Sequence, residues 1–343
     1  MKILHITESY GGGVTSAIDT YVSHSDQFEH YLFACVRDND KTGEEGEGGF
    51  KKTYLVKRNL RSLLRLRSVI AELKPDVLHL HSTYAGFFVR LMPYIERKKV
   101  VYTPHAFAFL RNQNPLLLKM YFYIEKLLAR RTHFIAGCGR DEMLIAQDFM
   151  EPENTFELIN ICAPIKHLQA NSLGNIKPVI AMLGRVSDQK GYDFFAEVAK
   201  RLQAHASLVW IGGGDSVGED ILRNAGVNVT GWADRSEVLK KLMKADLYFH
   251  TAAWDGFPIS VLEAAEFDKP IILRDIGPFA AEGLNTVLDI DDAVKEILCF
   301  LNDDPNALAR AHGNAMQIKS YHSPKNLQRS LDDLYIKFES VVK

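Results

Sequence analysis

Short apolar runs that alternate with longer amphipathic stretches constrain the fold of this chain most. In the first half, such runs occupy 2–6, 30–36, 76–81, 99–104 and 133–138. Helical patterns such as VTSAIDTYVSH and LLKMYFYIEKLLARR separate them. Strands joined by helices of this length pair in parallel, because a parallel pair needs a crossover connection. The first half is therefore predicted to be an α/β domain built on a parallel sheet.

The same alternation restarts after an interruption. The segment 150–177 is rich in Asn, Pro and Gly, which indicates a connection between domains. Further strands are predicted at 178–184, 206–212, 227–231, 245–250 and 269–274. A chain of 343 residues is longer than one typical domain. We therefore expect two successive α/β domains, 1–165 and 166–322.

The end of the chain, 320–342, has the pattern of one more amphipathic helix. Ser323 is a suitable N-cap, and Pro324 fits the first helical position, where a missing amide costs nothing. We therefore assign 323–343 to a separate C-terminal helix.

Charge and composition argue against several classes of protein. The net charge is −2 with a pI near 6.6, which does not suit a nucleic-acid binder that neutralises phosphates. The N-terminus is too short and too polar for a signal peptide, and no run of about 18 apolar residues predicts a membrane span. The cysteines, Cys35, Cys138, Cys162 and Cys299, form no CxxC pair. A metal cluster is not expected, and the predicted compartment is the cytoplasm.

Open α/β domains bind ligands in the loops that follow their strands. The first such loop contains Gly11, Gly12 and Gly13 before a helical pattern, an arrangement that suits an anion. A dinucleotide-binding motif is a weaker interpretation, because the third position of GxGxxG would be Ser16. Asp38 would then be its ribose-binding acid. A purely structural turn is a third interpretation.

Two loops of the second half carry side chains suited to a nucleotide. In LGRVSDQKG, Arg185 offers a planar fork and Lys190 a flexible point charge, a pair that suits a diphosphate. Alone, they would more simply be solvated loop cations. In VTGWADR, Gly231 and Trp232 could form a floor for a flat base, or Trp232 could belong to the core.

The stretch WDGFPISVLEA places two acids, Asp255 and Glu263, at the junction of a predicted strand and helix. The amides of Ile259 to Val261 are expected to point at a ligand, whereas Pro258 has no amide to offer. A helix N-terminus stabilises an anion, and an ionised carboxylate accepts hydrogen bonds from two hydroxyls. The two acids are therefore candidates for holding one ligand, although solvated loop acids would give the same pattern.

The order of these motifs resembles the retaining glycosyltransferases of family 4. The matching stretches are ESYGGGVTSAI, TPHAF, LGRVSDQKG, GGGD, VTGW and DGFPISVLEA. The last is similar to the family's Glu-x7-Glu signature, with Asp255 in place of the first Glu. The resemblance extends from residue 1 to about residue 275 and includes the closing helix. It implies the GT-B fold, in which two Rossmann-like domains face a central cleft and the helix 323–343 crosses back to the first domain.

The resemblance also implies roles for individual residues. Arg185 and Lys190 would hold the donor diphosphate, Glu263 the ribose, and Asp255 hydroxyls of the transferred sugar. The backbone of Gly256, Phe257, Pro258, Ile259 and Ser260 would lie against sugar and phosphate.

In the same way, Gly12 and Gly13 would cover the diphosphate, and Gly231 and Trp232 would lie beside the base. His105, in TPHAF, would contact the sugar near the reacting carbon, although a histidine there can also be an ordinary hydrogen-bonded residue.

The activity implied by the resemblance is transfer of a hexose from a nucleotide sugar with retention of configuration. It needs no metal and no cofactor, because Arg185, Lys190 and helix dipoles would stabilise the departing diphosphate. A UDP-sugar is the first expectation for the donor and GDP-mannose the second. The acceptor would be a glycan or a lipid-linked glycan of bacterial surface polysaccharide synthesis. The alternatives are a sugar-nucleotide-binding module without turnover and a GT-B sugar-nucleotide epimerase.

The stretch 57–67 combines arginines with interleaved leucines: Arg58, Arg61, Arg65 and Arg67. Such an amphipathic basic stretch suits an anionic membrane surface, and it equally suits a solvated helix face. Peripheral association with the inner face of the cytoplasmic membrane is therefore one expectation.

Overall fold

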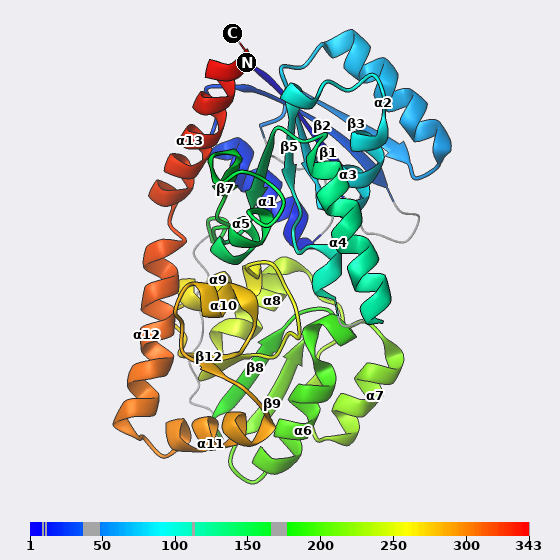
Figure 1. Cartoon of the computed structure of the whole chain (residues 1–343). Coiled ribbons are helices and arrows are strands. Elements are labelled where there is room, and N and C mark those ends of the chain that lie inside the picture. Colours follow the sequence, from blue (N-terminus) through cyan, green and yellow to red (C-terminus); the bar gives the residue numbers. More distant parts are fainter. Residues whose placement is uncertain (9, 11, 37–48, 112–113, 166–176, 343) are drawn as a thin grey trace. The chain divides into compact units, whose positions relative to one another are not determined.

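The computed structural model describes residues 1–343 except 9, 11, 37–48, 112–113, 166–176 and 343 (Figure 1). The chain forms two compact units. The first comprises Met1–Ala163 together with Pro324–Lys343, and the second comprises Pro164–Ser323.

Each unit is built on one parallel sheet. In the N-terminal unit the strand order is β3-β2-β1-β4-β5-β6-β7. Its strands are β1 (Lys2–Thr7), β2 (Glu29–Val36), β3 (Lys52–Lys57), β4 (Val77–His81), β5 (Val100–Thr103), β6 (Phe134–Gly137) and β7 (Thr155–Glu157). Five of them lie where the apolar runs predict.

Strands β3 and β7 were not predicted. They lie at the two edges of the sheet, where a strand pairs with a neighbour on one side only. Such a strand is less buried than a central one, so it needs no continuous apolar run. In β3 only Tyr54 is buried. Strand β7 has three residues and lies inside the segment that the sequence assigns to the connection.

Helices cover both faces of this sheet. They are α1 (Gly12–Ser23), α2 (Leu60–Leu73), α3 (Ser82–Leu91), α4 (Pro115–Ala129), α5 (Arg140–Ala146) and α13 (Pro324–Val342), with 3₁₀ turns at Arg97–Lys99, Ala108–Leu110 and Pro152–Asn154. Apolar side chains of β1 and β4, such as Leu4 and Leu80, form one core with Leu66 of α2 and Val89 of α3. Because side chains alternate along a strand, the next residues of β1 and β4 face the opposite layer.

The C-terminal unit repeats the architecture with the order β10-β9-β8-β11-β12-β13. Its strands are β8 (Val179–Leu183), β9 (Ser207–Ile211), β10 (Asn228–Val229), β11 (Leu247–His250), β12 (Ile271–Arg274) and β13 (Thr286–Val287). Its helices are α6 (Tyr192–Leu202), α7 (Ser216–Asn224), α8 (Arg235–Met243), α9 (Ile259–Glu266), α10 (Gly277–Ala281), α11 (Ile290–Leu301) and α12 (Pro305–Tyr321), with a 3₁₀ turn at Asp188–Lys190. Only the short edge strand β13 was not predicted.

The strand orders reverse direction at β1/β4 in one sheet and at β8/β11 in the other. Ligands of open α/β sheets bind at such switch points, beside the carboxyl ends of the strands. The two pairs of strands therefore mark where each unit is expected to bind a ligand.

The last helix is part of the N-terminal unit. Tyr335 of α13 contacts His79 of β4, with 2.9 Å between the hydroxyl oxygen and Nδ1, and Phe338 packs edge-on against Phe134 of β6. Helix α13 begins at Pro324, the first helical position that the sequence predicts, and α12 ends shortly before it at Tyr321. The closing helix thus covers the first sheet, as the GT-B resemblance implies.

Candidate functional site

The loops that follow β8 and β11 are joined by backbone contacts. The amide of Ala253 donates to the carbonyl of Gln189 over 2.9 Å, and the Thr251 hydroxyl donates to the carbonyl of Lys190 over 3.0 Å. Gly191 has a φ of 68°, and a Cβ there would lie 2.1 Å from the Thr251 carbonyl oxygen. Only glycine allows this approach, which holds Lys190 beside the loop of Asp255.

Lys190 and Asp255 form an ion pair. Their side chains are 19% and 15% exposed, so the pair is partly shielded from water and still reachable. Gln189 Nε2 lies 3.5 Å from the other oxygen of Asp255, and His250 Nε2 lies 3.9 Å from Oδ2. The sequence predicts these two charges as separate contacts to phosphate and sugar, whereas the structure brings them together.

His250 lies behind this pair and is fully buried. Burial first, and the positive charge of Lys190 second, hold the pKa of His250 well below its usual value. The imidazole is therefore neutral at physiological pH, and Lys190 supplies the positive charge beside Asp255. Sequence reasoning missed His250, although this histidine ends the run ADLYFH, shortly before the stretch WDGFPISVLEA.

Glu263 is paired with an arginine that the sequence analysis also missed. Arg235, the first residue of α8, places Nη1 at 2.6 Å from Oε1 of Glu263. Burial raises the pKa of Glu263, whose side chain is 5% exposed, and Arg235 opposes this shift. Arg235 ends the stretch VTGWADR, so its proximity in sequence to Trp232 was the available signal.

Helix α9 begins at Ile259 directly after Pro258. Of the three amides expected to point at a ligand, that of Val261 donates to the Pro258 carbonyl over 3.1 Å, so that part of the prediction is wrong. Within the part of the chain that the structure describes, the amides of Ile259 and Ser260 are paired with no acceptor. The Phe257 side chain is buried against Phe279.

Arg185 and Trp232 lie near each other on neighbouring loops. The Arg185 guanidinium carbon is 6.0 Å from the centroid of the Trp232 ring, and this tryptophan is 71% exposed. The interpretation of Trp232 as a core residue is therefore wrong. Gly231, with a φ of 71°, directs the chain into this exposed loop.

The glycines of IGGGD have a structural explanation. A Cβ on Gly212 would lie 2.2 Å from the carbonyl oxygen of Gly184, and one on Gly214 would lie 2.3 Å from that of Val186. These positions let the loops after β8 and β9 approach each other, independently of any ligand.

In the N-terminal unit, His105 follows β5 in an uncommon backbone conformation. His105 and Ala106 have φ values of 50° and 74°. Non-glycine residues in this region cost about 1–3 kcal/mol each and persist only where the surroundings enforce them. Here the Ala106 amide donates to the buried carboxylate of Glu142, whose Oε2 also accepts from the Cys138 amide over 2.9 Å.

His105 Nε2 lies 3.1 Å from Nδ1 of His81. Burial lowers the pKa of His105 to about 4, so the ring is neutral at physiological pH. His105 is therefore hydrogen-bonded, as its simpler interpretation requires, and it is also held in a conformation of the kind found at functional sites.

The glycine loop after β1 differs from its prediction. Gly12 and Gly13 lie within α1, in its first turn, rather than before it. The first amides of a helix have no partner within it, so these two positions remain compatible with an anion. Gly11 and Asp38, on which the dinucleotide interpretation depends, lie outside the described residues.

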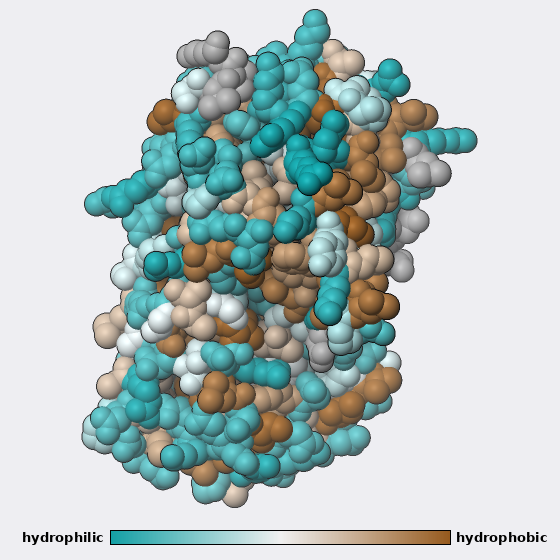
Figure 2. Space-filling model, viewed as in Figure 1, coloured by the Kyte–Doolittle hydropathy of each residue, from teal (hydrophilic) through white to brown (hydrophobic). Residues whose placement is uncertain are grey.

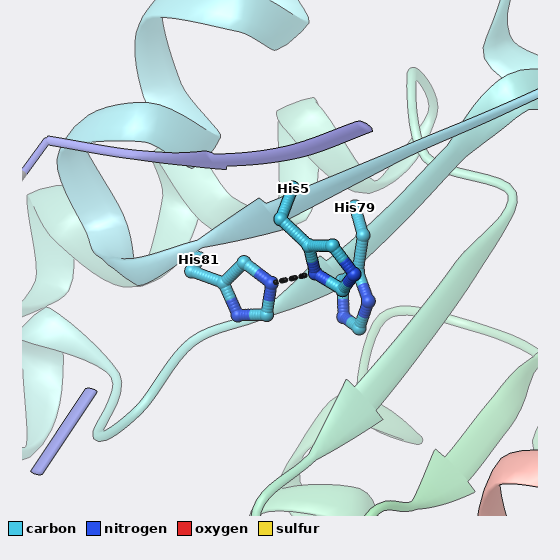
Figure 3. Close-up of side chains that lie close together, drawn as sticks. All are labelled: His5, His79 and His81. Atoms are coloured by element: carbon cyan, nitrogen blue, oxygen red, sulfur yellow. Dashed lines mark hydrogen bonds between the residues drawn. The ribbon is translucent and has the colours of Figure 1, made fainter. Parts of the chain in front are cut away.

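A cluster of buried histidines fills the face of the sheet under α1 and α13, and the sequence analysis did not use it. His5 of β1 faces His79 in register, and His81 follows on the same face of β4 (Figure 3). His5 Nδ1 and His81 Nε2 are 3.0 Å apart. The alternation HLH in β4, beside LHI in β1, was the available signal.

Two hollows of the C-terminal unit lie elsewhere. One of about 490 Å³ is lined by Asp268, His312, Ala315, Met316, Lys319 and Ser320, and another of about 220 Å³ lies between β12 and α12. Neither is lined by a candidate residue, so they take no part in the charge arrangement around Asp255.

The comparisons with known proteins agree with this architecture. Residues 10–152 match the family Glycosyltransferase Family 4, and residues 177–317 match Glycosyl transferases group 1. Among solved structures, a sucrose-phosphate synthase from Thermosynechococcus elongatus has a TM-score of 0.75, with 14% identity and coverage of 99% of this chain and 100% of that one. HepE from Anabaena in complex with UDP-glucose also has a TM-score of 0.75, with 15% identity and coverage of 98% and 100%.

These likenesses define a protein with the GT-B fold. Because both halves of the chain match glycosyltransferase families, the chain belongs to the group 1, or family 4, glycosyltransferases.

Curated relatives cover the chain to different extents. An uncharacterised 41.2 kDa protein in the cps region of Klebsiella pneumoniae is 29% identical over 323 residues, which is 87% of this chain and 88% of that protein. The UDP-Gal:alpha-D-GlcNAc-diphosphoundecaprenol alpha-1,3-galactosyltransferase of Escherichia coli is 25% identical over 244 residues. That match spans 64% of this chain and 62% of the E. coli enzyme, less than two thirds of either.

Proposed function

We propose that this glycosyltransferase moves a hexose from a nucleotide diphosphate sugar to a glycan or lipid-linked acceptor, with retention of configuration and without a metal ion. A UDP-sugar is the first candidate for the donor and GDP-mannose the second. The proposal rests on one arrangement in the C-terminal unit. The partly shielded Lys190–Asp255 pair and the Arg235–Glu263 pair flank the start of α9, where two amides have no partner among the residues that the structure describes.

This arrangement offers positive charge to a departing diphosphate. An ammonium has three donors, so Lys190 can hold Asp255 and a phosphate oxygen together. Arg185 and the N-terminus of α9 add a guanidinium and a helix dipole. Groups fixed in this way stabilise the charge that develops on the leaving group, which is electrostatic catalysis.

The two acids have different parts in this proposal. Glu263 has one oxygen bound to Arg235, and it would accept hydrogen bonds from the ribose hydroxyls. Asp255 is held by Lys190, so we assign it to positioning the sugar rather than to nucleophilic attack. The acceptor would then attack on the face that the diphosphate leaves, and the leaving phosphate would take its proton.

The names of the relatives support a lipid-linked acceptor. The E. coli relative is named for transfer to a GlcNAc-diphosphoundecaprenol. A Campylobacter jejuni relative, 32% identical over 103 residues, is named for an N,N'-diacetylbacillosaminyl-diphospho-undecaprenol. We therefore propose a polyprenyl-diphosphate-linked glycan as the acceptor and bacterial surface polysaccharide synthesis as the process.

The surface of the N-terminal unit fits such an acceptor. None of the helices in the described ranges has the length and apolarity of a membrane span. However, exposed apolar side chains recur at helical spacing on α3 and α4, where Figure 2 shows brown atoms gathered. They are Tyr84, Phe88 and Leu91 on α3 and Leu116, Met120, Tyr123 and Leu127 on α4.

Arginines of the stretch 57–67 adjoin these apolar side chains. The guanidinium carbon of Arg58 lies 5.2 Å from the ring centroid of Tyr84, and that of Arg67 lies 5.2 Å from the ring centroid of Tyr94. A surface that combines exposed apolar and aromatic side chains with arginines binds anionic leaflets. We propose that the protein associates peripherally with the inner face of the cytoplasmic membrane through this surface.

A panel of labelled nucleotide sugars, assayed with polyprenyl-diphosphate-linked glycans, tests the proposed reaction. The expected result is transfer from one donor, with the anomeric configuration retained in the product. Donor binding without turnover on any acceptor would instead identify a binding module, and conversion of the free nucleotide sugar would identify an epimerase.

Co-sedimentation with vesicles tests the proposed membrane surface separately. Vesicles of phosphatidylglycerol are expected to retain the protein, and vesicles of phosphatidylcholine are not. Replacing Tyr123 and Leu127 by Ser should weaken retention, while the control pair Lys200→Ser and Glu197→Ser, on an exposed face of α6, should leave it unchanged. Equal retention by both lipids, or by both variants, would contradict the proposal.

A further inference from the structure

A continuous chain of hydrogen bonds links four imidazole rings across the N-terminal sheet. It begins at Ser25, whose carbonyl oxygen lies 2.8 Å from Nε2 of His30. His30 Nδ1 lies 3.0 Å from Nε2 of His5, and His5 Nδ1 lies 3.0 Å from Nε2 of His81. The last link is the 3.1 Å contact between His81 Nδ1 and His105 Nε2. Every intermediate ring thus uses both of its nitrogens.

The Ser25 end gives this chain a direction. A backbone carbonyl can only accept, so His30 Nε2 must carry a proton. The Ser25 hydroxyl, 3.1 Å from the same nitrogen, donates its own proton to the carbonyl of Tyr21 over 2.6 Å. It too therefore offers His30 only a lone pair.

The rings themselves are neutral. Burial, followed by the neighbouring imidazoles, holds the pKa values of His5 and His81 well below the usual range. Burial also lowers the pKa of His30, although its bond to Ser25 and the charge of Asp26 oppose this. A neutral imidazole has one donor nitrogen and one acceptor nitrogen, so fixing one fixes the other.

Following this rule along the chain gives each ring the same tautomer. His30 Nδ1 accepts from His5 Nε2, and His5 Nδ1 accepts from His81 Nε2. His81 Nδ1 in turn accepts from His105 Nε2. The lone pair of His105 therefore remains on Nδ1, which has no hydrogen-bond partner among the described residues.

We propose that His81, His5 and His30 are positioning residues that lock His105 in the Nε2–H tautomer, so that its Nδ1 accepts a hydrogen bond from a sugar hydroxyl of a bound substrate. This proposal rests on the proposed function and names the residues that would orient one contact to its substrate. An acceptor nitrogen selects a hydroxyl, because a phosphate oxygen at neutral pH has no proton to donate. His105 lies at the carboxyl end of β5, next to the strand pair that marks the switch point, and its strained backbone fixes the direction of the ring.

The histidine cluster also has the geometry of a possible metal site, and the hydrogen bonds argue against it. One nitrogen from each of His5, His79 and His81 lies within 4.8 Å of the others (Figure 3). However, His79 already contacts the Tyr335 hydroxyl at 2.9 Å and the Thr103 hydroxyl at 2.8 Å. His79 therefore lies beside the chain without belonging to it, which makes it a matched control.

Nitrogen-15 NMR of the histidine side chains in the ligand-free protein tests the tautomers directly, near neutral pH. The expected spectrum has a protonated Nε2 and an unprotonated Nδ1 for His105, and the same for His81, His5 and His30. In His5→Phe, His81 loses its acceptor, so His105 should shift toward a mixture of tautomers. The control His79→Gln should leave the His105 signals unchanged.

Several results would overturn the proposal. They are a proton on Nδ1 of His105 in the wild-type protein, an averaged signal for its two nitrogens, or an unchanged His105 tautomer in a folded His5→Phe. Stoichiometric zinc in the purified protein, lost in His79→Gln, would also overturn it, because a nitrogen that binds a metal carries no proton. The wild-type spectrum alone decides the question if the variants do not fold.

Kinetics with the donor identified by the panel add a functional readout. His5→Phe should lower kcat/KM by about threefold to tenfold, the value of one neutral hydrogen bond. The wild type should discriminate against sugars in which the contacted hydroxyl is replaced by fluorine, which cannot donate, and His5→Phe should lose this discrimination. Equal effects in His5→Phe and His79→Gln would indicate a purely structural role. If no nucleotide sugar is turned over, the proposed function fails, while the NMR result still decides the tautomer lock.

Discussion

The two units share one architecture and use opposite chemistry at the ends of their strands. In the N-terminal unit His5 of β1, His81 of β4 and His105 after β5 are neutral and joined by hydrogen bonds. In the C-terminal unit one ion pair joins the loops after β8 and β11, a second joins α8 to α9, and both remain partly exposed. Burying an isolated charge is costly, so the buried imidazoles stay neutral, whereas partly exposed side chains can keep their charge. The first arrangement suits recognition of hydroxyls, because each imidazole nitrogen is either a donor or an acceptor. The second suits stabilisation of a charged leaving group.

Removing the positive charge of the C-terminal unit should have the largest effect. Lys190→Ala is expected to lower kcat by about 100-fold or more, because in the proposed mechanism it removes a fixed donor to the leaving diphosphate. The measurement is turnover with the donor found by the panel. Lys200→Ala, which removes an exposed lysine of α6 that pairs with Glu197, is the control and should keep full activity. A Lys190→Ala protein with unchanged kcat would remove this residue from the leaving-group site.

Neutralising the acid of the same pair should have a smaller effect. Asp255→Asn keeps the size of the side chain and is expected to lower kcat by about tenfold to 100-fold, because in the proposed mechanism the carboxylate positions the sugar and orients Lys190. Binding of the free nucleoside diphosphate should change little. Steady-state kinetics and calorimetry measure the two quantities, and an equal loss of both would indicate a structural role for Asp255.

The second ion pair should control nucleotide affinity rather than turnover. Glu263→Gln is expected to weaken nucleoside diphosphate binding by about tenfold, because a carboxylate accepts hydroxyl donors more strongly than an amide does. The variant should also lose the preference for ribose over 2′-deoxyribose. Glu237→Gln, at an exposed carboxylate of α8, is the control. A Glu263→Gln protein that still prefers ribose would show that this acid does not bind the sugar hydroxyls.

The neutral histidines of the N-terminal unit lead to a prediction about stability. Burial lowers the pKa of His105 from 6.5 to about 4 and that of His79 to about 3, so the unfolded chain binds protons that the folded unit does not. Stability should therefore fall as the pH falls below 6.5. For each such histidine, the equilibrium constant of unfolding should rise by about tenfold per pH unit.

Urea denaturation as a function of pH measures this dependence. In His79→Gln the slope should decrease by about one proton, whatever the variant does to stability at neutral pH. A free energy of unfolding that rises as the pH is lowered from 6.5 to about 4 would contradict the assignment of neutral rings.

The sequence determined much of the fold because buried parallel strands need continuous apolar runs, and these runs are visible without a structure. It missed β3, β7 and β13 because short edge strands carry no such run. It located Asp255 and Glu263 through a local motif. Their partners Lys190 and Arg235 lie 65 and 28 residues away, and only packing decides which charge meets which.

The histidine cluster shows the same limit. His5 lies on β1 and His79 and His81 lie on β4, and each alone is indistinguishable from a satisfied core histidine. Parallel pairing in register places His5 opposite His79, and only then do the rings form one network. Register depends on the whole sheet, so no local pattern reveals a hydrogen-bonded chain of this kind.

The smallest effect is expected from removing metal ions. In the proposed mechanism Lys190, Arg185 and the α9 amides supply the positive charge that a divalent ion would otherwise give, and the histidine nitrogens of the N-terminal unit are bonded to one another. Treatment with EDTA should therefore change kcat by less than about twofold. Activity that is abolished by EDTA and restored by Mg²⁺ or Mn²⁺ would place the charge stabilisation on a metal. Restoration by Zn²⁺ alone would instead point to the histidine cluster, so the assay distinguishes the two units as well as the two mechanisms.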